Sequence, residues 1–310
     1  MKSILFIRGG ALGDFILTLP SMHVVRERFP AARVEVMGYS HIAALVDRRF
    51  YANAVRSIEQ RSVAGFFAAR GDLDPELSAY FASFETVVSW LYDPDFIFSD
   101  NLKRAGVTRL IRAEGSPTRE VHATEHLAKW LFEFKMDASL SAPRIYPSAE
   151  DRAQSLKMLA RDTPRVALHI GSGSPAKTWP AARFAEIATW LQERGVEVLI
   201  IQGPADMESE REFSKHGVAR DCSRLKDLTL PVLSAVLEQC LFFLGHDSGI
   251  SHLAAAVGIP TIALFGPTDP ALWAPRGPSV TVLRKNPDLA SLSVEDVKRA
   301  LEPRLQSRRR

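Results

Sequence analysis

The sequence of 310 residues has few cysteines, no long hydrophobic run and little net charge. Its two cysteines, Cys222 and Cys240, lack C-x-x-C spacing and are too few for a disulfide framework, so we expect a reducing, cytoplasmic setting. The apolar run near the N-terminus, residues 4–7, is far shorter than the core of a signal peptide. No run approaches the roughly 18 residues of a transmembrane span, so any contact with a membrane is expected to be peripheral.

The composition is that of a globular protein, with 46% hydrophobic and 24% charged residues. A formal net charge of +3 is too small to indicate nucleic-acid binding, and we expect no nucleic-acid partner. The length fits two domains of about 150 residues each.

Apolar, β-branched runs alternate with amphipathic helical stretches along the whole chain, which predicts a parallel α/β architecture. In the first half we expect strands at residues 4–8, 33–39, 54–58, 86–90 and 109–113. In the second half we expect them at residues 165–171, 197–203, 241–245, 261–266 and 280–284.

Helix signals and a linker divide the chain. A helix is expected from the opening loop to Phe29, interrupted near Pro20, and a long one over residues 120–134. We expect residues 180–195 to form a helix with proline at its start and glycine at its end, and a last helix to start near Val294. The Ser-, Ala- and Pro-rich residues 137–151 indicate a linker. The predicted domains are therefore 1–145 and 146–290, followed by a C-terminal helix and basic tail, 291–310, with a ligand cleft between the two domains.

The stretch "RGGALGD", Arg8 to Asp14, follows the first strand and has the form of a phosphate-binding turn, except that it ends in a carboxylate. Asp14 either caps the next helix or acts as a general base on a neutral hydroxyl. A dinucleotide-binding turn is disfavoured, because Arg8 stands at the first glycine position and the second strand ends in Gly38 rather than an acid.

A second motif, "HIGSGSPAKTWP", covers residues 169–180 and nearly matches the Walker A loop. Ala176 replaces the second glycine, and Pro180 indicates that the helix starts after Lys177, so nucleoside-triphosphate hydrolysis is disfavoured. A loop of small residues with a mobile ammonium suits a diphosphate, and the alternative is a surface lysine.

The third motif, "FLGHDSGISHLAAAVGIPTIALFGPTDP", covers residues 243–270. Ser248 and Gly249 place small residues and free N–H groups at a helix N-terminus, which fits a diphosphate. We expect Asp247 to cap this helix or to orient His252 or a hydroxyl. His252 itself is either structural or functional.

Two weaker signals are interpreted as structural features and not as functional sites. "HATEH", residues 122–126, matches the H-x-x-E-H zinc signature, but its flanks are plainly amphipathic and we expect capping or solvated histidines. The stretch Trp90-Leu91-Tyr92 offers an aromatic for stacking on a sugar, or belongs to the core, which we favour.

Together, "LGDFILTLP", "AKTWP" with "RFAEIATWL", and "DSGISHLAAAVGIPTIALFGPTDP" resemble the signatures of the lipopolysaccharide heptosyltransferases, glycosyltransferase family 9. The matches lie in the family's order over residues 4 to about 275. The resemblance implies a GT-B fold, in which two Rossmann-like domains with parallel sheets face each other across a cleft. It further implies inverting transfer of heptose from ADP-heptose to a hydroxyl of the lipopolysaccharide core, with no metal or other cofactor.

By this resemblance, Asp14 is the general base and Lys177 is a ligand of the donor phosphates. The other substrate-binding candidates that it implies are Gly13, Ser172, Gly173, Glu208, Asp247, Ser248, Gly249, Ile250 and His252. His246 departs from the family's pattern of asparagine or an apolar residue, which leaves the donor sugar open. Another GT-B transferase or epimerase that uses a different nucleotide sugar, and a non-catalytic nucleotide-sugar-binding protein, stay open as alternatives.

The acceptor implied by the resemblance is an anionic glycolipid at the cytoplasmic face of the inner membrane. The first half offers cations that either bind it or lie on solvated faces, namely Arg8, Arg26, Arg28, Arg33, Arg48, Arg49, Arg61, Lys103, Arg104 and Arg119. Only local clusters such as Arg48-Arg49 are expected to form a basic patch.

Overall fold

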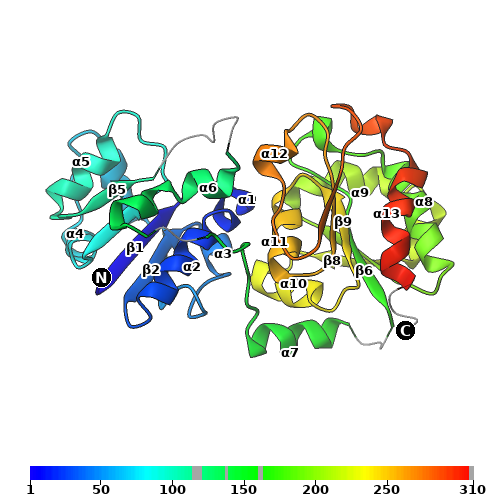
Figure 1. Ribbon diagram of the computed structural model, residues 1–310, viewed down its shortest axis with the longest axis horizontal. Coiled ribbons are helices and arrows are strands. Elements are labelled where there is room, and N and C mark those ends of the chain that lie inside the picture. The colour runs from blue at the N-terminus through cyan, green and yellow to red at the C-terminus, as the bar shows by residue number, and fades with distance from the viewer. Residues whose placement is uncertain (114–120, 137–138, 160–162, 307–310) are drawn as a thin grey trace. The chain divides into compact units, whose positions relative to one another are not determined.

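The computed structural model describes residues 1–113, 121–136, 139–159 and 163–306. The chain separates into two units, Met1–Ser141 and Ala142–Arg310, and each contains its own parallel sheet (Figure 1). The boundary lies inside the stretch that the composition indicates as a linker. Arg119, the predicted helix start at residue 120 and the last four residues of the basic tail lie outside the described residues.

The sheet of the first unit has five strands in the order β3-β2-β1-β4-β5, and each neighbouring pair is parallel. The strands are β1 Ser3–Arg8, β2 Arg33–Gly38, β3 Ala54–Ser57, β4 Thr86–Ser89 and β5 Leu110–Arg112. All five strands predicted for this half are confirmed. Strand β1 is central because its run from Ile4 to Ile7 is wholly buried, as a strand covered on both faces requires.

Helices cover both faces of this sheet. They are α1 Leu12–Ile16, α2 Leu19–Arg28, α3 Ser40–Ala43, α4 Pro75–Ala82, α5 Ile97–Arg104 and α6 Ala123–Leu127, with 3₁₀ helices η1 Arg61–Phe67 and η2 Lys129–Phe134. The predicted interruption near Pro20 is confirmed, since α1 ends at Ile16 and Pro20 occupies the first turn of α2, where its missing N–H is tolerated.

The long helix predicted over residues 120–134 is wrong. It is broken at Ala128 into α6 and η2. The carbonyl of Leu127 accepts a hydrogen bond of 3.0 Å from the indole of Trp90, and the ring of Trp130 packs against those of Phe6 and Trp90. Burying these aromatic rings together takes precedence over continuing a regular helix.

The second unit has a six-stranded parallel sheet in the order β11-β10-β9-β6-β7-β8. The strands are β6 Arg165–His169, β7 Glu197–Gln202, β8 Ser223–Lys226, β9 Phe243–His246, β10 Thr261–Leu264 and β11 Val280–Leu283. The five strands predicted here are confirmed, but β8 was not predicted. It is an edge strand in which only Leu225 is buried, so it carries no apolar run to detect.

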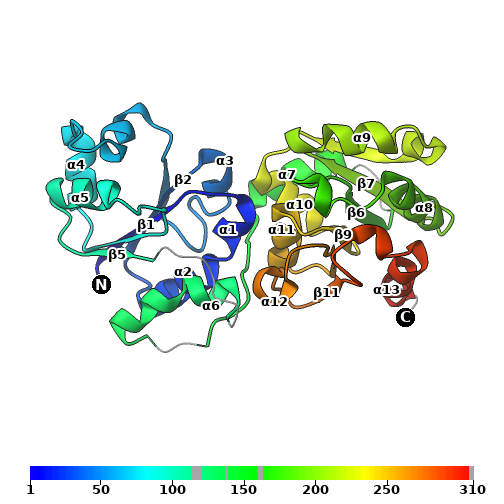
Figure 2. The same ribbon diagram turned by 90° about the horizontal axis from the view of Figure 1, so that it is seen from above.

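The helices of this unit are α7 Ala149–Met158, α8 Ala181–Gln192, α9 Met207–Phe213, α10 Leu230–Leu237, α11 Gly249–Val257, α12 Pro270–Trp273 and α13 Val294–Gln306. The 3₁₀ helices are η3 Pro175–Lys177, η4 Pro204–Asp206, η5 Gly217–Asp221 and η6 Leu289–Ser291. Helices α7, α10 and α11 lie on one face of the sheet, and α8 and α13 lie on the other (Figures 1 and 2).

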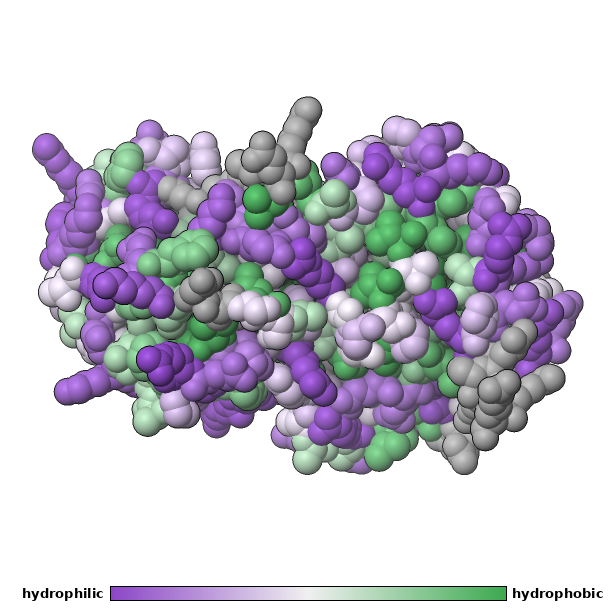
Figure 3. Space-filling model, viewed as in Figure 1, coloured by the Kyte–Doolittle hydropathy of each residue, from purple (hydrophilic) through white to green (hydrophobic). Residues whose placement is uncertain are grey.

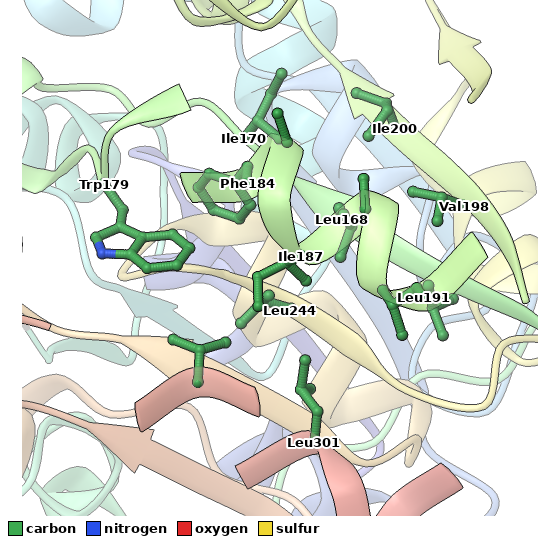
Figure 4. Close-up of a cluster of buried hydrophobic side chains, with 14 of the residues drawn as sticks. Leu168, Ile170, Trp179, Phe184, Ile187, Leu191, Val198, Ile200, Leu244 and Leu301 are labelled. Atoms are coloured by element: carbon green, nitrogen blue, oxygen red, sulfur yellow. The ribbon is translucent and has the colours of Figure 1, made fainter. Parts of the chain in front are cut away.

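The core between the sheet and the second of these helix layers is shown in Figure 4. Leu168 and Leu244 of the sheet meet Phe184 and Ile187 of α8, and Leu301 attaches α13 to the same cluster. The C-terminal helix is therefore packed into the second unit. This core supports the loops that leave the carboxyl ends of β6 and β9.

None of the described helices combines the length and apolar character that a membrane span needs. Hydrophilic and hydrophobic side chains are interspersed on the surface of each unit in the view of Figure 3.

Candidate active site

The strand orders place a topological switch point in each sheet. In the second unit the chain passes from β6 to β7 and β8 on one side, then returns to β9, β10 and β11 on the other. The switch point of this sheet is therefore between β6 and β9, and in the first unit the same argument gives β1 and β4. Ligands of open parallel sheets bind at the carboxyl ends of such strands.

Lys177 and Asp247 meet at the switch point of the second sheet. Lys177 lies in the loop after β6 and Asp247 directly follows β9, and Nζ of Lys177 donates to Oδ2 of Asp247 over 2.6 Å. The lysine side chain is 34% exposed and the aspartate side chain 9%. The expectation that Asp247 caps the helix is wrong, because Ser248 holds the N-cap position and the Asp247 carboxylate is bound to the Lys177 ammonium instead.

The helix that follows, α11, starts at the switch point with small residues. Ser248 is its N-cap and Gly249 and Ile250 form its first turn, so their N–H groups have no acceptor within the helix. Oγ of Ser248 lies 3.4 Å from Nδ1 of His169, the last residue of β6. An anion placed here would meet backbone N–H groups, the positive end of the helix dipole and the Lys177 ammonium.

A buried pair, His169 and Asp206, was not predicted. Nε2 of His169 lies 3.0 Å from Oδ2 of Asp206, and the same oxygen accepts from the N–H of Gly203 at 2.7 Å. Burial works to raise the pKa of Asp206, but these hydrogen bonds hold the pKa below its ordinary value. Asp206 sits in η4, beyond β7, where the sequence shows no recognisable pattern. Only the position of His169 at the start of the second motif could have hinted at the pair.

The remaining donor-site candidates have varied surroundings. The Ser172 hydroxyl donates to the carbonyl of Ser174 at 2.6 Å and thus closes the loop on itself, and Gly173 borders open space. His252 is buried in the first turns of α11. Glu208 lies on α9 with its side chain 74% exposed, 3.8 Å from Arg211.

Asp14 lies at the switch point of the first sheet. It is the third residue of α1, after Gly13, and its Oδ2 accepts from the N–H of Ala11 at 3.3 Å. Its side chain is 38% exposed, and its Oδ1 lies 3.8 Å from Nη2 of Arg8. The tight turn depends on Gly10, whose φ of +96° favours glycine. Asp14 therefore stabilises the helix start and still presents a carboxylate to solvent.

Arg8 joins this turn to the loop after β4. Its side chain is only 12% exposed, and Nη1 donates to the carbonyl of Trp90 at 3.2 Å. Burial lowers the pKa of the Arg8 guanidinium, and the Asp14 charge acts in the opposite sense. Trp90 belongs to the core, as predicted, but the same expectation is wrong for Tyr92, which is 87% exposed.

The zinc-like motif supplies a helix cap. His122 precedes α6, and its Nδ1 accepts from the N–H of Thr124 at 3.2 Å. Among the residues that the structure describes, no three His, Cys, Asp or Glu side chains gather as metal ligands.

The family model described as "Glycosyltransferase family 9 (heptosyltransferase)" matches residues 106–300, which include both the Lys177 loop and the Asp247 turn. The chain belongs to this family. Family 9 members are glycosyltransferases, and the chain is therefore an enzyme of that class.

Known proteins of the family resemble this glycosyltransferase over most of its length. Lipopolysaccharide heptosyltransferase 3 of Escherichia coli is 24% identical over 291 residues, which cover 85% of this chain and 83% of the relative. The structure of E. coli ADP-heptose lipopolysaccharide heptosyltransferase II superposes with a TM-score of 0.83 at 18% identity and covers 100% of both chains. The structure of E. coli heptosyltransferase WaaC with ADP superposes with a TM-score of 0.70 at 20% identity and covers 97% of this chain and 99% of WaaC. The glycosyltransferase thus has the GT-B fold that the sequence resemblance implies.

Proposed function

We propose that this glycosyltransferase moves a heptose from ADP-heptose to a hydroxyl of a lipopolysaccharide core or related glycan. The names of its relatives support both substrates, and the WaaC structure with ADP supports an adenine nucleotide. The observation that carries the proposal is the Lys177 ammonium, held at the switch point of the second sheet next to the first turn of α11.

In this proposal the second unit holds the departing ADP. Lys177 and the N–H groups of Gly249 and Ile250 would bind the diphosphate, and the small residues Ser172 and Gly173 would let it approach the backbone. A fixed cation and aligned N–H groups stabilise the negative charge that grows as the glycosidic bond breaks. The positive charge that stabilises the leaving diphosphate would thus come from the chain itself, and we propose that no metal is required.

Glu208 has the weakest support among the proposed donor ligands. Its side chain is 74% exposed on α9, and it would reach the ribose of ADP only by leaving Arg211. Asp247 and Ser248 lie at the same switch point, and we propose that they complete the donor site together with His252, which is buried in the first turns of α11.

The first unit would supply the general base. The exposed carboxylate of Asp14, oriented by the N–H of Ala11 and by Arg8, would accept the proton of the acceptor hydroxyl as this attacks the anomeric carbon. Attack from the face opposite to the leaving diphosphate inverts that carbon. A carboxylate with an ordinary pKa near 3.9 is a weak base, but positive charge at the anomeric carbon acidifies the hydroxyl at the same moment.

We propose an anionic glycolipid as the acceptor, reached at the cytoplasmic face of the inner membrane by peripheral contact. Of the two residues of the predicted Arg48-Arg49 patch, only Arg48 supports this acceptor. Arg48 is 82% exposed, whereas Arg49 donates to the carbonyl of Ala44 at 2.6 Å. Lys103, 62% exposed, and Tyr92 in the loop after β4 are further surface groups for an acidic sugar.

The proposal is tested by product analysis with ADP-heptose and purified core glycolipid, with and without EDTA. We expect ADP release, an inverted glycoside and equal rates in both buffers. Titration calorimetry with ADP-, UDP- and GDP-sugars separates this function from that of another GT-B enzyme. Preferred binding of a UDP- or GDP-sugar, or a product with retained configuration, would contradict the proposal. Binding of ADP-heptose without product would contradict the proposed acceptor.

A further inference from the structure

His246, the last residue of β9, is fully buried and forms hydrogen bonds through both ring nitrogens. Nδ1 lies 2.9 Å from the carbonyl oxygen of Gly171, and Nε2 accepts from the N–H of Trp179 at 2.8 Å. A carbonyl can only accept, so the proton is on Nδ1 and the ring is the neutral tautomer. One side chain thus satisfies two backbone groups of a single loop.

The two backbone groups are at opposite ends of the loop that carries Lys177. Between them, the hydroxyl groups of Ser172 and Thr178 both donate to the carbonyl of Ser174, at 2.6 and 3.1 Å. These bonds fold the loop on itself, but they do not attach it to the sheet. His246 makes that attachment, to the end of β9.

The imidazole ring is itself held in place. The ring of Phe184 packs edge-on against it with centroids 5.2 Å apart. Trp179 is anchored beyond the loop, because its indole N–H donates to the carbonyl of Leu292 at 3.0 Å. The two hydrogen bonds of His246 to the loop are therefore made within the core and not at the surface.

The next residue in the chain, Asp247, acts on the same loop, since its carboxylate binds the Lys177 ammonium. Two consecutive residues thus fix one loop. His246 binds both of its ends, and Asp247 binds Lys177 between them. Burial lowers the pKa of His246 to about 4, so the neutral ring with its donor and its acceptor persists at physiological pH.

We propose that His246 is a positioning residue for donor binding, which fixes both ends of the Gly171–Trp179 loop so that Lys177 is preorganised for the diphosphate. This rests on the proposed function, in which Lys177 binds the donor phosphates. A group that is preorganised binds its ligand without the entropic cost of ordering a loop, and a small misplacement of it weakens binding strongly.

The test compares His246→Leu and His246→Asn with His122→Leu, which removes another buried histidine that bonds to a backbone N–H, in the first unit. We measure ADP affinity by calorimetry, KM and kcat for the donor, melting temperature, and hydrogen exchange over residues 171–179. His246→Leu should weaken ADP binding and raise the donor KM about tenfold or more, with faster exchange in the loop. His246→Asn can replace one of the two hydrogen bonds, so its ADP affinity and donor KM should lie between those of the wild type and His246→Leu. His122→Leu should lower the melting temperature and leave ADP affinity and donor KM unchanged.

Unchanged ADP affinity and donor KM in a folded His246 variant would overturn the proposal, even if its melting temperature fell. His246→Asn serves if the leucine variant does not fold. Should the wild-type protein bind no ADP and transfer no heptose, the proposed function fails, but hydrogen exchange still decides the role of His246. Hydrogen exchange over residues 171–179 that is equal in the His246 variants and the wild type then overturns the positioning role of His246.

Discussion

The ammonium of Lys177 and the carboxylate of Asp247 lie 2.6 Å apart at the carboxyl ends of two neighbouring strands, β6 and β9. The carboxylate is almost buried, whereas the lysine is one-third exposed. An acid next to a proposed phosphate site is therefore explained without making it a phosphate ligand. Under the proposed function, it would hold a flexible lysine in one place before the diphosphate binds, and the ammonium has further donors for that anion.

Replacing Lys177 by methionine should weaken ADP binding by about 1.5–3 kcal/mol, or roughly ten- to a hundredfold, because a charge-assisted hydrogen bond to phosphate is lost. Titration calorimetry measures this directly. Lys215→Met is the matched control, since Lys215 forms an ion pair of the same length, 2.6 Å, with Glu212 on the exposed surface of the same unit. Equal ADP affinity in both variants would remove Lys177 from the donor site.

Replacing Asp14 by asparagine or alanine should lower the transfer rate by about 10²–10⁴-fold while ADP affinity stays the same, because a general base acts on the acceptor and not on the nucleotide. Initial rates of product formation, with calorimetry for ADP, separate the two effects. Glu76→Gln removes an exposed acid from the first turn of α4 in the same unit and should leave the rate unchanged. Normal turnover by Asp14→Asn would exclude Asp14 as the base.

Lowering the pH from about 6.5 to 4 should destabilise the second unit through His246. The unfolded chain binds a proton at the ordinary histidine pKa near 6.5, whereas burial lowers the pKa of His246 in the folded state to about 4. The unfolded state therefore binds more protons in this range, and stability is present above pH 6.5 and lost as the pH falls.

The loss should amount to on the order of 3 kcal/mol at pH 4. It is measured as the pH dependence of urea unfolding in the wild type and in His246→Leu. His169, Asp206 and Asp247 also act on this ring, but they are present in both proteins, so the difference between the two slopes isolates His246. Parallel slopes would contradict the assignment.

Gly171→Ala should destabilise the second unit by about 1–3 kcal/mol. A Cβ at this position would come within 1.9 Å of Oδ1 of Asp206, and that carboxylate cannot move away because His169 and the N–H of Gly203 hold it. Calorimetric melting measures the effect. Gly217→Ala is the control, since a Cβ there would meet open space, and a melting temperature equally lowered by both substitutions would discount the clash.

Much of the fold follows from local patterns. The strands of the first sheet and five of the second are short apolar runs between turn residues, and the start of α8 after Pro180 is a local steric effect. Strand β8 escaped prediction because a sheet edge buries little. The helix over residues 120–134 was predicted wrongly because contacts of Trp90 and Trp130 with distant residues decide its break.

The sequence by itself determined the two parallel α/β halves and singled out Asp14 and Lys177, because hydrophobic periodicity and turn chemistry act between residues close together in the chain. Only the tertiary structure decided the partners of these residues. Lys177 meets Asp247 across 70 positions and His246 meets Gly171 across 75, since the sheet places β9 beside β6. Strand order results from packing the whole unit, so no local pattern contains it.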